Sequence, residues 1–196
     1  GRSLSERFQR PADETAEISQ LKELYVFHYE DLNGDLSPYL ERWLAALETL
    51  RPVINVYFAA LLNQSVYSET QFLSYAQALE VFHVREYGRM ETLRERMLDL
   101  LQRKSYTSAI IFDAERFAEQ FVNSRHFYTH YDPKKSERAL EGEALVWLSE
   151  QTRVLMRSLL LEKMGFAPEK ITELVTRGLG YGRYREAVER HLGPGE

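Results

Sequence analysis

One arginine and two histidines near residue 125 are the side chains whose types and spacing best suit catalysis. They belong to the stretch Asn123-Ser-Arg-His-Phe-Tyr-Thr-His-Tyr-Asp132. Histidine can accept or donate a proton near neutral pH. The planar guanidinium of arginine binds a phosphodiester and stabilises the charge of its pentavalent transition state. Arg125 and His130 therefore suffice for metal-free cleavage of RNA through the ribose 2′-hydroxyl, a group that DNA lacks.

An apolar stripe at helical spacing precedes this stretch and predicts that it lies on a helix capped by Asp113. One more turn along the stripe leads to Arg125 and His126, at positions where the pattern asks for apolar residues. Charged groups at such positions are costly unless they are paired, and such conflicts are typical of functional sites. The stripe consists of Ala114, Ala118, Phe121 and Val122.

The directions in which the side chains of Arg125 and His130 point predict a dimer. Five residues separate them, so their side chains diverge by roughly 140° around an ideal helix. One copy alone would not easily direct both at one phosphate, although a helix end loosening near Tyr131 would help. Two copies about a two-fold axis would place an Arg and a His from each around a shared cleft. We therefore expect a homodimer with an RNA substrate.

Glu80 is the second polar residue out of place. The spacing predicts a helix over residues 69–87, and Glu80 lies on its apolar stripe. Its carboxylate either reaches water from an edge position or is buried against a cation from another helix, for which Arg125 is the obvious candidate. The stripe consists of Leu73, Ala76, Glu80, Val84 and Tyr87.

The rest of the chain predicts an all-α fold, because no alternating strand pattern of useful length occurs. Pro52 should break or kink the helix that starts at Pro38, and Asn33-Gly34 indicates a turn. Gly165 is expected to cap a long helix, and Pro168 to open a short one. Residues 1–12 are interpreted as a tail or linker, and 13–196 as one helical domain. The remaining helices are expected over 13–28, 90–104, 137–164 and 184–192.

Composition narrows the function classes. The chain of 196 residues is 44% hydrophobic and contains no cysteine, which excludes disulfides, thiolate zinc sites and a thiol nucleophile. Its net charge of -5 argues against an extended basic surface for nucleic-acid binding but does not exclude a short, locally basic groove. No run approaches the ~18 apolar residues of a membrane span, and no leader opens the chain. We expect a cytoplasmic protein without membrane contact, and a start at Gly1 suggests a piece of a longer protein.

The stretch from Arg125 to His130 resembles the R-polar-x-x-x-H motif of the HEPN superfamily. Its surroundings look like the Apea-like HEPN family over roughly residues 66–166. The segments that carry this similarity are Gln71-Phe-Leu-Ser-Tyr-Ala-Gln-Ala-Leu-Glu80, Phe121 through Asp132, Ala139-Leu-Glu-Gly-Glu-Ala-Leu145 and Leu160-Leu-Glu-Lys-Met-Gly165.

This resemblance implies a HEPN-type helical bundle, here with extra N- and C-terminal helices, that dimerises and cleaves RNA without metal or cofactor. It also implies a separate upstream sensing domain and a role in phage defence or a toxin-like stress response. By position, Arg125 would stabilise the phosphate, His130 would be the general acid or base, and Glu80 would fix Arg125 by an ion pair. His126 would orient the phosphate or the partner's histidine. The family often has Asn at this position, which leaves the details of activity open.

Residues beside the motif are candidates for RNA contact. The rings of Tyr128 and Tyr131 could stack on bases, and Asn123 could bond to the strand. Lys134 and Lys135, with Arg138 behind them, could steer RNA toward the motif or could simply form a solvated turn.

Two other functions remain open. His126 and His130 have the i, i+4 spacing of zinc-binding helices, but the sequence lacks the Glu of H-E-x-x-H. Further ligands would have to come from Asp132, His28 or His83. Alternatively, Arg125 only pairs with Glu80, His130 only caps the helix, and the chain is a non-catalytic interaction module.

Overall fold

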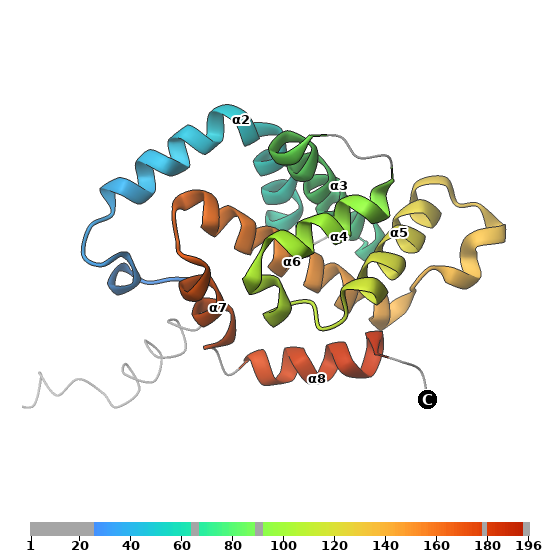
Figure 1. Ribbon diagram of the computed structural model, residues 1–196. Coiled ribbons are helices and arrows are strands. Elements are labelled where there is room, and N and C mark those ends of the chain that lie inside the picture. The colour runs from blue at the N-terminus through green and yellow to red at the C-terminus, as the bar shows by residue number, and fades with distance from the viewer. Residues whose placement is uncertain (1–25, 64–66, 89–91, 178–179, 194–196) are drawn as a thin grey trace, which may run out of the picture. The chain divides into compact units, whose positions relative to one another are not determined.

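The computed structural model describes residues 26–63, 67–88, 92–177 and 180–193 and divides into two compact units, Gly1–Leu36 and Ser37–Glu196 (Figure 1). In the first unit the described residues form one 3₁₀ helix, η2 (Tyr29–Leu32). Asn33 and Gly34 follow it with φ of 54° and 78°, which confirms the predicted turn. The predicted tail over 1–12 and most of the helix expected over 13–28 lie outside the described residues, and residues 26–28 are not helical.

Every regular element among the described residues is helical, which confirms the all-α class. In the second unit they are α2 (Ser37–Leu62), α3 (Ser68–Tyr87), α4 (Leu93–Arg103), η3 (Ser105–Ala109), α5 (Ala114–His130), η4 (Pro133–Arg138), α6 (Gly142–Met164), α7 (Pro168–Thr176) and α8 (Gly180–Leu192).

Helix α3 is the centre of the bundle in the second unit. It packs against α2 and α6 on one side and against α4 and α5 on the other, while α8 lies on α6. Aromatic side chains fill the contacts, and Phe72 of α3 meets Phe121 of α5 edge to face with ring centroids 5.8 Å apart. Full burial of each such ring stabilises the fold by about 1.5–3 kcal/mol. The rings with the least exposure are Tyr57, Phe72, Tyr75, Phe82, Tyr106 and Phe121.

The buried face of α3 differs from the predicted stripe by about one residue. The bulky aromatics Phe72, Tyr75 and Phe82 take the core, whereas Leu73 is only half-buried and Val84 is exposed. Volume explains the difference, because the core between three helices is filled by the largest apolar groups available. Glu80 consequently lies at the border of the buried face, within reach of neighbouring helices.

Helix α2 runs through Pro52 without a break, so the predicted division into two pieces is wrong. Proline removes the hydrogen bond to the carbonyl of Glu48. Both residues are on the exposed side of α2, where water can bond to that carbonyl instead.

Helix α2 also corrects the expectation that no segment comes close to a membrane span. Among the described residues it alone has the necessary length and composition, with a hydropathy of 1.3 over its best window. In this structure 33% of that window is buried, and the core helices of soluble proteins meet the same criterion.

The long helix expected over 137–164 begins later, at Gly142, and the preceding residues form η4. Gly142, the first residue of α6, has a φ of 57°, a left-handed conformation that favours glycine. At the other end Gly165 has a φ of 99°, and its N–H donates to the carbonyl of Glu162, so it caps α6 as predicted. Pro168 opens α7 as predicted.

Candidate functional site

Helix α5 carries the Arg-His stretch, and both of its ends are fixed by local chemistry. The Asp113 side chain accepts a hydrogen bond from the backbone N–H of Arg116 at 3.0 Å, which makes it the predicted N-cap. Tyr131 adopts a left-handed conformation with φ 49°, and Pro133 then prevents continuation. His130 is therefore the last residue of the helix.

The buried stripe of α5 passes beside Arg125 and His126 rather than through them. It continues from Phe117 and Phe121 to Ser124 and Tyr128, while Arg125 and His126 are half-buried at its edge. The predicted conflict with the apolar pattern is therefore milder than expected. A side chain at this border can have its stem packed and its polar head in a groove.

Arg125 and Glu80 form the ion pair that the sequence predicts, between α5 and α3. The guanidinium Nε donates to Oε1 of Glu80 at 2.7 Å, and Nη2 donates to Oε2 at 3.4 Å. The Arg125 side chain is 32% exposed and that of Glu80 is 16% exposed. The pair is thus bidentate and partly shielded from water, a geometry that orients the guanidinium plane.

Arg96 of α4 is a second cation at the same carboxylate. Its Nη1 lies 3.9 Å from Oε2 of Glu80, and its side chain is only 15% exposed. Sequence reasoning missed it, because a charged residue on an amphipathic helix normally faces solvent, and no spacing rule links α4 to α3.

These groups line one hollow of about 250 Å³ between α3, α4 and α5. It contains two guanidiniums and one carboxylate, with His126 at its wall. The two guanidiniums offer N–H donors that an anion could accept. The lining residues are Glu80, Leu93, Arg96, Val122, Arg125 and His126.

His126 stands between this hollow and His130. The two imidazoles are one helical turn apart, with ring centroids separated by 4.9 Å. The ammonium of Lys135, from η4, contacts Nε2 of His126. Partial burial lowers the pKa of His126, and the positive charges of Lys135, His130 and Arg125 lower it further. His126 therefore favours its neutral form more than an ordinary histidine does.

Ser124 and Tyr128 have a structural role on α5. The backbone N–H of Leu140 donates to Oγ of Ser124 at 3.0 Å, and the hydroxyl of Tyr128 donates to the carbonyl of Leu140 at 2.8 Å. Both backbone polar groups of Leu140 are thus satisfied by side chains of α5. The Tyr128 side chain is 5% exposed, so its ring has no free face for the base stacking that the sequence suggested.

The other candidate RNA-contacting residues differ in exposure and in their distance from the motif. Tyr131 is 62% exposed and follows His130 directly. Lys134 is exposed, and Lys135 points back to His126. Asn123 lines a separate hollow with Arg138 and Arg94. The structure therefore gathers Arg125, His126, His130, Lys135 and Glu80 and sets Asn123 apart.

The sequence model of the Apea-like HEPN family matches residues 73–170. The match spans half of the chain and includes every residue of the site from Glu80 to Lys135. This chain belongs to the Apea-like HEPN family. No curated protein and no solved structure matches it.

The described residues of this HEPN chain include no group of three or more His, Asp or Glu side chains placed to hold a metal ion. His83, one of the possible extra ligands, is fully buried, and its Nε2 lies 2.8 Å from Oδ2 of Asp99. His28 precedes η2 in the first unit.

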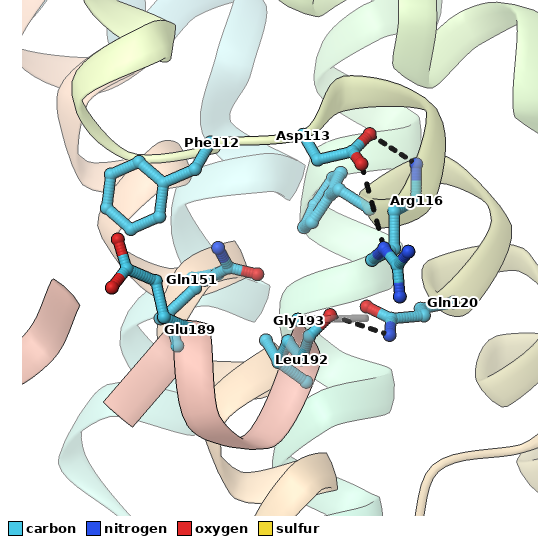
Figure 2. Close-up of a pocket in the computed structure, with 10 residues that line it drawn as sticks. Phe112, Asp113, Arg116, Gln120, Gln151, Glu189, Leu192 and Gly193 are labelled. Atoms are coloured by element: carbon cyan, nitrogen blue, oxygen red, sulfur yellow. Dashed lines mark hydrogen bonds and ion pairs between the residues drawn. The ribbon is translucent and has the colours of Figure 1, made fainter. Parts of the chain in front are cut away.

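A smaller hollow of about 140 Å³ lies where α8 meets α5 and α6 in the second unit (Figure 2). Gln120 points toward the end of α8, and its Nε2 donates to the carbonyl of Leu192 at 3.2 Å. Gln151 donates to the carbonyl of Ile110 at 3.2 Å. The Gln120 bond links α5 to α8, and the Gln151 bond links α6 to the end of η3.

Proposed function

We propose that this HEPN chain is a metal-independent endoribonuclease whose site is completed by a second copy of the chain. The observation that carries the proposal is the Arg125–Glu80 ion pair, which fixes a guanidinium beside His126 and His130 at the positions of the family motif. By analogy with the family, phage defence or a toxin-like stress response is the proposed setting.

The N–H donors of the hollow support a phosphodiester as the bound group. The guanidiniums of Arg125 and Arg96 both lie within ion-pair distance of Glu80, and both bring N–H donors to the place where a phosphate would bind. Because Nε and Nη2 of Arg125 face Glu80, its remaining N–H groups are available to a phosphate oxygen. Lys135 adds positive charge at the side of His126.

The proposed reaction uses the ribose 2′-hydroxyl as its nucleophile. One histidine accepts the 2′-hydroxyl proton while the 2′-oxygen attacks phosphorus. Arg125 stabilises the negative charge of the pentavalent transition state. The bond to the 5′-oxygen breaks, and a second histidine protonates that leaving oxygen. The products are a 2′,3′-cyclic phosphate and a 5′-hydroxyl, and no metal takes part.

His130 is the proposed acid or base, and a dimer supplies two copies of it. His126 is the proposed orienting group, and its lowered pKa favours the neutral form in the protein without substrate. Its ring packs beside that of His130 and limits the directions that His130 can take.

The test is cleavage of a fluorescent RNA in EDTA by the purified protein. Arg125→Ala and His130→Ala should each lower the rate by about a hundredfold or more. An RNA with a single 2′-deoxy residue at the cut should not be cleaved there. Arg94→Ala is the matched control, because Arg94 is exposed on α4 and pairs with Glu115 outside the hollow.

Chelator-sensitive cleavage, or cutting at a 2′-deoxy residue, would contradict the proposed chemistry. If Arg125→Ala and His130→Ala leave the protein's biological effect unchanged, the chain acts as an interaction module instead.

A further inference from the structure

Helix α5 ends on a tyrosine whose backbone conformation is unusual for so large a side chain. Tyr131 has a φ of 49°, in the left-handed region that residues other than Gly and Asn rarely adopt. Among the described residues, every other position with a positive φ in this region holds glycine or, at Asn33, asparagine. A bulky residue at the end of α5 therefore has a conformational cost that Gly or Asn would avoid.

The ring of Tyr131 is also largely open to solvent. Tyr131 is 62% exposed, and its ring centroid lies 5.6 Å from that of Phe127 and 6.1 Å from that of Tyr128. Phe127 is half-buried and Tyr128 is buried, so both supporting rings are held by the fold. A residue that is costly in its backbone and leaves most of its surface in water points to a role beyond folding.

Basic side chains flank this ring in the chain. His130 precedes it and is exposed, and Lys134 and Lys135 follow in η4, where both are exposed. Lys135 in turn contacts His126 of the Arg-His site. An aromatic ring among basic groups is the arrangement by which proteins bind single-stranded nucleic acid, because a base stacks on the ring while the cations contact phosphates. The core of a protein interface is instead depleted in lysine.

We propose that Tyr131 stacks on a base beside the scissile phosphate and so restricts the substrate to unpaired RNA. The inference rests on the proposed nuclease function, which supplies the identity of that phosphate. The base lies on the exposed side of the ring, and the phosphate next to it reaches His130, one residue away. A base inside an A-form duplex is already paired and stacked between its neighbours. The substrate class is therefore a single strand or a loop.

The test is RNA binding by the full chain, measured by fluorescence anisotropy at one fixed salt concentration. The probe is a labelled 2′-O-methyl oligoadenylate, whose blocked 2′-oxygens prevent cleavage. It is compared with an abasic strand of the same length and with the same oligoadenylate paired to its complement. The unchanged protein should bind the single-stranded oligoadenylate about tenfold more tightly than the abasic strand, as expected for stacking on an aromatic ring. It should also prefer the single strand to the duplex.

Tyr131→Asn should remove the preference for the strand that carries bases. Asn adopts the left-handed conformation readily, so the end of α5 is kept and the melting temperature should change by less than about 4 °C. Tyr131→Phe should retain the preference, because stacking uses the ring and not the hydroxyl. Tyr67→Asn is the matched control, since Tyr67 is 84% exposed at the N-cap of α3 and does not line the Arg-His hollow.

Three results would overturn the proposal. The first is equal binding of the oligoadenylate and the abasic strand, or of the single strand and the duplex, by the unchanged protein. The second is a Tyr131→Asn protein that keeps the preference for bases. The third is a Tyr131→Asn protein that sediments as a monomer while the unchanged protein is a dimer, which would assign the ring to the contact between copies.

Cleavage of an unmodified single-stranded RNA separates this proposal from the nuclease function. Tyr131→Asn should raise KM about tenfold and change kcat less than about threefold, because the stacked base is bound equally before and during the reaction. If the unchanged protein cleaves RNA and Tyr131→Asn has the same KM, the stacking proposal fails alone. If the unchanged protein cleaves no RNA but Tyr131→Asn still removes the preference for bases, the nuclease proposal fails alone.

Discussion

At the scale of single residues, the neighbours of His126 decide its charge. Partial burial and three nearby cations all favour its neutral form, and only Asp132 acts in the opposite direction. The unfolded chain keeps an ordinary histidine pKa of about 6.5. The folded state therefore binds fewer protons, so this residue's contribution to stability is present above that pH and is lost as the pH falls.

Lys135→Met should raise the pKa of His126, because it removes the ammonium that contacts Nε2. An NMR titration of the imidazole Hε1 resonance measures the change. Lys134→Met is the matched control, since Lys134 is the neighbouring exposed lysine and is not among the groups that shift His126. Equal titration curves for the two variants would show that the Lys135 contact is absent in solution.

At the scale of elements, the sequence predicted most helices but not the packing that joins them. Caps and breakers such as Asp113, Gly165 and Pro168 act locally and were placed correctly. The start of α6 was placed too early, because Leu140, just before it, is held by hydrogen bonds to Ser124 and Tyr128 from another element. Such long-range pairing leaves no periodic signal.

Ser124→Ala should lower the free energy of unfolding by about 1–3 kcal/mol, because the N–H of Leu140 loses its buried partner. Urea denaturation measures this loss. Thr129→Ala on the same helix should change stability by less than about 0.5 kcal/mol, since its exposed hydroxyl bonds only to the Arg125 carbonyl within α5. A Ser124→Ala protein as stable as the Thr129→Ala protein would show that Leu140 is not held in this way.

At the scale of the whole molecule, the family match and the site geometry lead to one proposal about assembly. The motif residues were found from the sequence by a local pattern, and the Glu80–Arg125 pair was predicted and is confirmed. Arg96 was not predicted, because only the packing of α4 against α3 brings it to Glu80. The proposed dimer rests on the divergence of Arg125 and His130 along α5.

Mixing inactive Arg125→Ala and His130→Ala proteins should restore a small part of the RNA cleavage, because a mixed dimer regains one Arg125 beside one His130 but still lacks the second His130 as acid or base. If two copies exchange freely, about half of the dimers are mixed and contain one intact Arg125 and one intact His130. Cleavage assays on the mixture, with sedimentation to establish the dimer, measure this. A monomer in sedimentation, or a mixture that exchanges subunits and stays inactive, would contradict a shared cleft.

The contact between Lys135 and His126 has a consequence for how a substrate would enter. An incoming polyanion competes for the same ammonium and draws it away from the imidazole. Once Lys135 has turned to a phosphate, the charge next to Nε2 is neutralised, and His126 takes up a proton more readily. Substrate arrival and proton uptake would then be a single coupled event, and the free protein would hold its orienting histidine uncharged until a strand is present.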